Sequence, residues 1–241
     1  IMAYAGICSS NVQNNSDDYF HTVSLDEIMD YINDYGSCAV TSSGSNTEPV
    51  IQNLTSYTIP QGTAFILKGN ATDANGDALT YCWEQTDTGT SANNPLPTAT
   101  TGPNYRSLDN SLSPNRYMPT LQNVLANDLE PAWEKTPTVG RTLGFALTVR
   151  DNAVPYGQTA RKNMTVTVKA AAGPFAVTSQ NTTGISYQGA SQQTITWTVA
   201  GKTANSINNA NVNILLSNDA GQNFSTVMLS GTANDGTEVV T

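Results

Sequence analysis

The segment 73–77, with the sequence DANGD, places oxygen-bearing side chains at alternate positions around a glycine. Calcium takes six to eight oxygen ligands, and carboxylates and side-chain amides supply them. The spacing therefore predicts a calcium site formed by Asp73, Asn75 and Asp77, with Asp151 as a further candidate ligand. The same residues are also typical of a plain Asn-Gly hairpin turn held by side-chain-to-backbone bonds, and the pattern leaves both interpretations open.

An EF-hand is excluded as the form of this site. Glu84 stands at the twelfth position counted from Asp73, where an EF-hand loop has its bidentate glutamate. Residues 79–83, however, alternate between two faces as a strand does, whereas an EF-hand loop continues into a helix. The oxygen ligands are therefore expected at the end of a β-domain.

No motif for hydrolytic catalysis is found in this sequence. His21 is the only histidine, so neither a Ser-His-Asp triad nor a three-ligand zinc site can be built. The pattern HExxH does not occur, and no motif indicates a pair of glycosidase carboxylates. The chain by itself is predicted to be catalytically inactive.

The first eight residues read IMAYAGIC. They resemble the Met-turn of secreted bacterial reprolysin-like metzincins, a family of zinc endopeptidases. The resemblance implies that Met2 forms an apolar floor beneath the zinc ion and that Tyr4 stabilises the tetrahedral intermediate. In that family the Met-turn follows a helix with the motif HExxHxxGxxH, which supplies three zinc ligands and a glutamate general base. Zinc is therefore expected in a larger parent protein, of which this chain is a C-terminal segment.

Residues 24–36 carry the signals of a helix. Ser24 and Glu27 match a capping box, and Gly36 matches a left-handed stop, so we expect a helix over 25–35. One face of this helix is apolar, through Leu25, Ile28, Met29 and Ile32. Residues 1–46 are too few to bury that stripe by themselves, so we expect this block to pack on its C-terminal neighbour or on another copy of the chain.

Composition points to a secreted or cell-surface protein. The net charge of −9 excludes the basic surface that nucleic acids or anionic membranes require. No apolar run reaches the roughly 18–20 residues of a membrane span. Thr, Ser and Asn are abundant and charged residues make up 12 % of the chain, as is typical of extracellular β-proteins.

The three cysteines do not form a CxxC pattern, so neither a zinc ribbon nor a thioredoxin-like site is indicated. In an oxidising compartment Cys8 and Cys38 would close a loop of about thirty residues, stabilising the fold by roughly 3–4 kcal/mol. Cys82 lies in a strand-like run and is expected to be a buried free thiol.

Apolar residues alternate with polar ones over much of residues 47–170, for example from Leu143 to Val149. This pattern, with Trp83 on an expected central strand, predicts an immunoglobulin-like β-sandwich. Residues 71–85 and 147–152 resemble those of polycystic-kidney-disease-type and cadherin-like domains, which commonly follow the catalytic domain of secreted bacterial proteases. Residues 86–140 lack the alternation, and we expect an ordered insertion with short helical turns at 121–125.

Alternation resumes after the hinge at 170–174, which predicts a second immunoglobulin- or fibronectin-like sandwich over 171–241. About 70 residues are short for such a domain, so we expect it to be truncated. Residues 217–224 resemble an Asp-box, a hairpin turn whose role is to stabilise the fold. The expected fold is thus mainly β, two tandem immunoglobulin-like sandwiches behind a short helical remnant of a metzincin catalytic domain (1–46).

These observations predict the non-catalytic C-terminal segment of a secreted zinc-dependent metalloendopeptidase. Its β-domains are expected to act as spacer, substrate-docking or surface modules, with a protein substrate or an extracellular ligand as partner. An adhesin-like or carbohydrate-binding extracellular β-protein without a protease parent is the alternative. It explains the sandwiches equally well, but not the capped helix and the Met-turn that precede them.

Overall fold

The computed structural model describes residues 5–7, 10–40, 42, 44–89, 94–201 and 203–241. Over these residues the chain is mainly β, as predicted, and it has two α-helices. Its helical elements are α1 (Thr22–Tyr35), η1 (Gly36–Cys38) and α2 (Leu121–Leu125). Its strands are β1 (Val50–Ile51), β2 (Tyr57–Pro60), β3 (Phe65–Lys68), β4 (Ala71–Thr72), β5 (Thr80–Gln85), β6 (Asn115–Met118), β7 (Arg141–Arg150), β8 (Thr159–Lys169), β9 (Gln193–Thr196), β10 (Asn211–Leu216), β11 (Thr226–Ala233) and β12 (Thr237–Val240).

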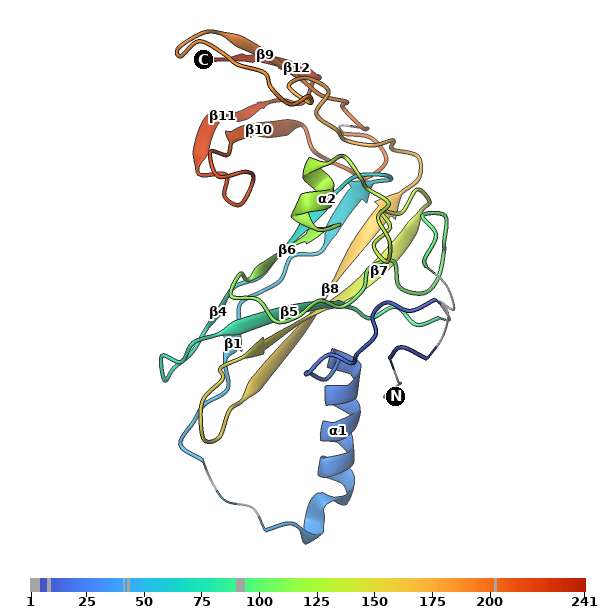
Figure 1. Ribbon diagram of the computed structural model, residues 1–241, viewed down its shortest axis with the longest axis vertical. Helices are drawn as coiled ribbons and strands as arrows, with labels where there is room; N and C mark the ends of the chain where they lie inside the picture. The colour runs from blue at the N-terminus through green and yellow to red at the C-terminus, as the bar shows by residue number, and fades with distance from the viewer. Residues whose placement is uncertain (1–4, 8–9, 41, 43, 90–93, 202) are drawn as a thin grey trace.

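The largest sheet has the strand order β2-β8-β7-β5. Strands β7 and β8 form a long antiparallel pair from Arg141↔Val168 to Arg150↔Thr159, and β2 joins β8 in parallel. Two smaller sheets, β3-β6 and β1-β4, are built from the same part of the chain. Helix α1 lies at one end of the elongated molecule and strands β9–β12 lie at the other (Figure 1).

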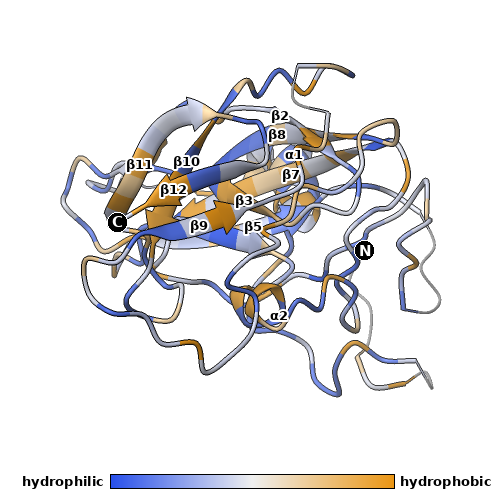
Figure 2. Cartoon of the chain, turned by 90° about the horizontal axis from the view of Figure 1, so that it is seen from above, coloured by the Kyte–Doolittle hydropathy of each residue, from blue (hydrophilic) through white to orange (hydrophobic). Residues whose placement is uncertain are grey.

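The main hydrophobic core lies on one face of this four-stranded sheet. The predicted alternation along β7 is confirmed, because Leu143, Phe145, Leu147 and Val149 are all fully buried in the core. Strands β3 and β6 contribute Leu67 and Met118. Seen from the C-terminal end, hydrophobic stretches of several strands gather near the centre of the molecule (Figure 2).

Trp83 corrects one detail of the sequence prediction. It lies on β5, at the edge of the four-stranded sheet and not in its middle. The open side of β5 is covered by the segment around Ser111, which exchanges two backbone hydrogen bonds with Tyr81. The indole NH of Trp83 donates to the Pro114 carbonyl at 2.9 Å. The insertion therefore completes the sheet edge, and it contains the predicted helical turn at 121–125, which is α2.

The opposite face of the sheet is covered by the N-terminal block. Glu84 points to this face and is fully buried there. Its carboxylate accepts a 2.7 Å hydrogen bond from the Thr22 amide and a 3.1 Å hydrogen bond from the Ser107 hydroxyl. The Tyr19 hydroxyl donates to the Leu108 carbonyl, and Arg161 donates to the Thr22 carbonyl. The N-terminal block is thus fixed to the region of strands β1–β8 (50–169), called the β-body below, which is one of the two expected arrangements.

Helix α1 starts three residues earlier than predicted, and the Ser24–Glu27 capping box does not form its end. His21 is the N-cap, and its Nδ1 accepts from the Val23 amide at 3.2 Å. The Thr22 amide is satisfied by Glu84, which is distant in sequence. Because the first amides of a helix need acceptors from outside it, these two partners allow the helix to begin at Thr22.

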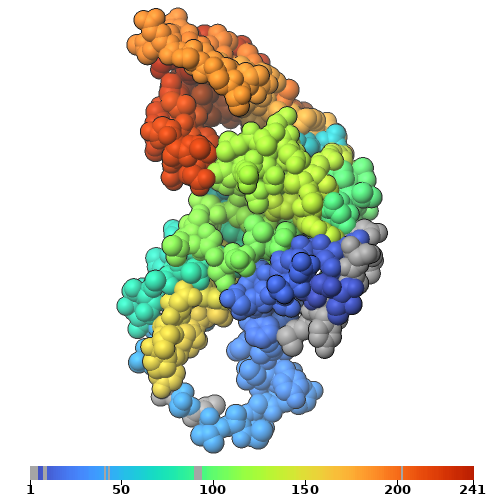
Figure 3. All heavy atoms as spheres, in the orientation of Figure 1, coloured from blue at the N-terminus to red at the C-terminus, as the bar shows by residue number. Residues whose placement is uncertain are grey.

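The apolar stripe of α1 remains largely exposed, because the block docks through the start of the helix and not through its side. Met29 and Ile32 are 54 % and 51 % exposed. Figure 3 shows an open gap between α1 and the hairpin that joins β7 to β8. The stripe is therefore not buried against the strands of this chain, and its burial against another copy of the chain stays a prediction.

The strands after residue 175 form two small sheets, β9-β12 and β10-β11. Trp197 is buried there, and its indole NH donates to Asn234 Oδ1 at 2.8 Å. No helix in the described ranges has the length and apolar composition of a membrane span.

Glu84→Gln tests the connection between the N-terminal block and the sheet. Glutamine keeps the shape but removes the charge and one acceptor oxygen, so it weakens the charge-assisted bond to the Thr22 amide. We expect the free energy of unfolding to fall by about 1.5–3 kcal/mol, measured by urea denaturation.

Glu48→Gln is the matched control, because Glu48 is exposed and its substitution removes the same charge. It should change stability by less than about 0.5 kcal/mol. Equal stability of the two variants would contradict the anchoring role of Glu84.

Candidate metal centre

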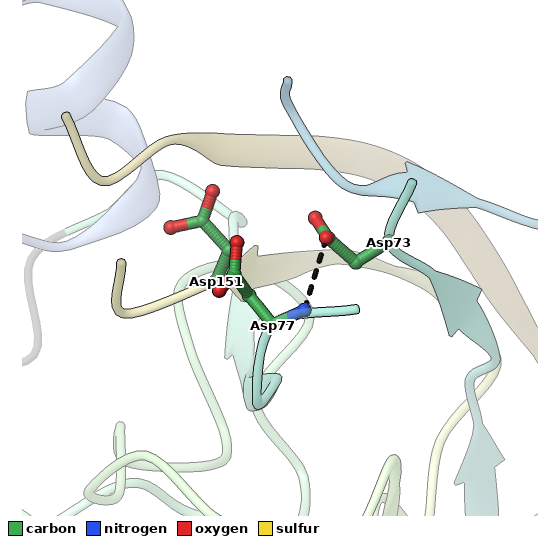
Figure 4. A group of neighbouring side chains, drawn as sticks. All are labelled: Asp73, Asp77 and Asp151. Atoms are coloured by element: carbon green, nitrogen blue, oxygen red, sulfur yellow. Dashed lines mark hydrogen bonds between the residues drawn. The ribbon is translucent and has the colours of Figure 1, made fainter. Parts of the chain in front are cut away.

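Three of the four candidate calcium ligands meet at one end of the β-body. Asp73 and Asp77 lie in the loop between β4 and β5, and Asp151 directly follows β7. One carboxylate oxygen from each lies within 4.8 Å of the other two (Figure 4). Residues more than 70 positions apart in sequence therefore converge, because β5 and β7 are antiparallel neighbours and the start of one strand lies beside the end of the other.

Asp151 is the buried member of the cluster, with 1 % of its surface exposed. Its carboxylate accepts hydrogen bonds from the backbone amides of Ala153 and Gln158 and, at 2.6 Å, from the side-chain amide of Asn46. Burial alone raises the pKa of Asp151, but these hydrogen bonds outweigh it and hold the pKa below its usual value. Asp151 is therefore an anion near neutral pH.

The sequence left open whether Asp73 binds calcium or only stabilises a turn, and Asp73 has features of both. Its Oδ1 accepts from the amides of Asn75 and Asp77 at 2.8 and 3.1 Å, which is the Asx-type turn. Its Oδ2 is buried and has no hydrogen-bond partner within the described residues. A buried acceptor without a partner is costly, and a cation or an ordered water would satisfy it.

Asn75, the fourth candidate, is engaged elsewhere. Its Oδ1 accepts from the Thr47 amide at 3.0 Å. Together with the Asn46–Asp151 bond, this contact ties the segment that follows α1 to both loops of the cluster. Asn46 was not among the residues singled out from the sequence, because it lies in a Ser/Gly/Asn/Thr-rich linker with no ligand motif.

The cluster supplies the type of ligand that calcium takes, namely carboxylate oxygens. Calcium–oxygen distances are about 2.3–2.6 Å, so two ligands on opposite sides of one ion lie roughly 5 Å apart. The three carboxylate oxygens lie within 4.8 Å of one another, so a single ion could contact all three after small side-chain movements. Three oxygen donors are fewer than the six to eight that calcium takes, and backbone carbonyls and waters supply the remainder in such sites.

The structure does not describe the residues that the resemblance links to the zinc site of a parent protein. Met2, Tyr4 and Cys8 lie outside the described residues. His21 caps α1, and its Nε2 lies 3.7 Å from Glu84 Oε1, so its contacts are those of a helix cap. Cys38, the expected disulfide partner of Cys8, is exposed at the end of η1.

Cys82 is buried and free, as predicted. Burial and the neighbouring Glu84 raise its pKa to about 12, so it remains a neutral thiol. Its Sγ lies 3.4 Å from the Leu108 carbonyl. These surroundings give Cys82 a packing role.

The Asp-box-like segment forms the turn between β10 and β11. Asp219 accepts hydrogen bonds from the Asn223 amide, the Ser217 hydroxyl and the Asn223 side chain. These bonds, led by the one from the Asn223 amide, lower the pKa of Asp219 to about 2. The segment is a hydrogen-bonded hairpin turn, in agreement with the structural role expected for it.

Comparison of the chain with models of protein families and with curated proteins found no match.

Lowering the pH tests the role of Asp151. Because its pKa is lower in the folded state, its contribution to stability is present above the unfolded value near 4 and is lost as the pH falls through the folded pKa. In a calcium-free buffer, Asp151→Asn should lower the melting temperature at pH 7 by roughly 3–10 °C. The variant should also lose less stability than the wild type between pH 5 and pH 3.

Asp30→Asn serves as the control, because Asp30 is exposed on α1 and its substitution removes the same charge. Its melting curve should follow that of the wild type at each pH. Parallel pH profiles for wild type and Asp151→Asn would contradict the lowered pKa.

Proposed function

We propose that this chain is a non-catalytic, calcium-stabilised accessory region of a secreted zinc-dependent metalloendopeptidase of the metzincin type. Its β-region acts as a spacer or docks the protein substrate or an extracellular ligand. Proteolysis itself belongs to a zinc-binding helix that this sequence does not contain. Zinc in the parent protein would supply the activated water that attacks the scissile carbonyl.

The resemblance of IMAYAGIC to a Met-turn supports the metzincin part of this proposal. On that resemblance, Met2 lies beneath the zinc ion of the parent protein and Tyr4 stabilises the tetrahedral intermediate. The sequence has one histidine and no HExxH motif, which supports a role other than catalysis for the chain itself.

The observation that carries the accessory role is the attachment of the N-terminal block to the sheet through buried Glu84. A flexible linker would let a β-region move independently of the segment before it. Here the Thr22 amide, the Tyr19 hydroxyl and Arg161 all join the two parts. Such an attachment suits a module that holds a fixed position relative to a neighbouring domain.

We infer that the β-region comprises two immunoglobulin-like sandwiches, the first (47–170) of the polycystic-kidney-disease or cadherin-like type. Two observations support this inference for the first sandwich. They are the four-stranded sheet with a core on one face and the short β3-β6 sheet, which contributes to the same core. Buried Trp197 and the strand pairs β9-β12 and β10-β11 support it for the second (171–241).

Calcium in this proposal fixes the linker to the β-body. Asp73, Asp77 and Asp151 would hold the ion, and Asn46 and Asn75 connect the chain after α1 to the same two loops. The ion would also neutralise the repulsion among three carboxylates that lie close together. Calcium would thereby make the attachment of the N-terminal block more rigid.

Calcium titration of the purified chain tests this role. At a concentration a hundred times the dissociation constant, binding adds about 2.7 kcal/mol, which corresponds to a rise in melting temperature of roughly 5–10 °C. Asp77→Asn removes one ligand charge without removing a described side-chain hydrogen bond, and it should abolish most of the rise. Asp30→Asn should keep it, and an unchanged melting temperature in wild type would contradict the calcium site.

The protease assignment is tested by the gene sequence that precedes the codon for Ile1. A motif HExxHxxGxxH encoded shortly before it would support the proposal, and its absence would favour the adhesin-like alternative. The purified chain itself should not cleave an unfolded protein substrate in the presence of zinc. Zinc-dependent cleavage that a chelator stops would contradict the non-catalytic role.

A further inference from the structure

A pocket of about 200 Å³ lies where the insertion covers the β5 edge of the main sheet, and it shares no residue with the carboxylate cluster. Strand β5 contributes Tyr81 to it, and β6 contributes Tyr117. The insertion contributes the segment around Leu108 and Asp109, and the start of α2 contributes Leu121. Neither the candidate calcium site nor the protease assignment involves this pocket.

The apolar walls of the pocket are held in place by the backbone and by hydrogen bonds. Tyr81 exchanges backbone hydrogen bonds of 2.8 and 2.9 Å with Ser111. The Tyr117 hydroxyl donates to the Gly221 carbonyl at 3.2 Å. Two tyrosines and two leucines, Leu108 and Leu121, thus form a largely preformed apolar surface.

The rim of the pocket is polar and accessible. Asp109 and Asn115 are exposed, and neither side chain makes a hydrogen bond to another residue in the part of the chain that the structure describes. A carboxylate offers acceptors, and an amide offers both a donor and an acceptor. The Ser111 hydroxyl adds a further donor at the rim.

The charges around the pocket disfavour an anionic ligand. Arg116 is the cation that lines the pocket, but its guanidinium already donates to the carbonyls of Trp83 and Arg106 and to Glu134. Asp109 at the rim and the net charge of −9 repel acidic groups. The ligand is therefore expected to be either neutral or a cation, such as an ammonium group, that only donates hydrogen bonds.

We propose that this pocket binds one ring of a neutral carbohydrate. A pyranose presents an apolar C–H face, which packs on aromatic rings, and a ring of hydroxyls that both donate and accept. Sites for drug-sized ligands measure about 300–1,000 Å³, so 200 Å³ suits a single sugar unit. An apolar peptide side chain would form no hydrogen bond with Asp109 or Asn115, and a lysine ammonium could not accept from Asn115 or Ser111.

Titration of the full chain with glucose, galactose, mannose and N-acetylglucosamine, followed by NMR chemical shifts, tests this proposal. At least one sugar should bind with a dissociation constant on the order of 1 mM and shift the resonances of Tyr81 and Tyr117. Asp109→Ala and Asn115→Ala are exposed substitutions that leave the apolar walls intact, and each should weaken binding about tenfold or more. Asp128→Ala, in the exposed loop after α2, is the control and should bind like the wild type.

Three results would overturn the proposal. They are the absence of shifts with every sugar, binding that is unchanged in both rim variants, and tighter binding of a lysine-containing peptide than of any sugar at the same residues. The proposal rests neither on calcium nor on the protease assignment, so failure of either leaves this experiment decisive.

Discussion

A buried carboxylate on β5 accepts from the first amide of α1, and the position of the N-terminal block depends on this contact. Glu84 is fully buried, so its charge would destabilise the fold by several kcal/mol if it had no partners. The Thr22 amide and the Ser107 hydroxyl supply them, one from the N-terminal block and one from the long insertion. A single side chain of the sheet therefore holds both neighbouring segments in place.

The second connection lies where the chain enters the β-body after α1. Asn46 and Thr47 bind the loops that carry Asp151 and Asn75. The N-terminal block is thus attached at the start of its helix and again where the chain after the helix enters the β-body, while the side of the helix stays open. Calcium at the carboxylate cluster would act on the second attachment, and Glu84 acts on the first without any ligand.

Sequence patterns correctly predicted those elements that depend on interactions between residues close together in the sequence. The alternation from Leu143 to Val149 follows the burial of one strand face, and the helical turn at 121–125 forms where it was expected. The start of α1 was missed because its acceptor, Glu84, is 62 positions away from Thr22. Likewise, the parallel pairing of β2 with β8 and the edge position of Trp83 depend on contacts between distant segments.

The candidate metal site illustrates the same division. Asp73 and Asp77 belong to one motif, and Asp151 joined them in the prediction and in the structure, whereas Asn46 carries no signal in the sequence.

Hydrogen exchange at the Thr22 amide tests the central claim, the fixed attachment of the N-terminal block, most directly. We expect protection comparable to that of amides in β7, because the amide is bonded to a buried carboxylate. Exchange as fast as that of an unprotected linker amide would contradict the account.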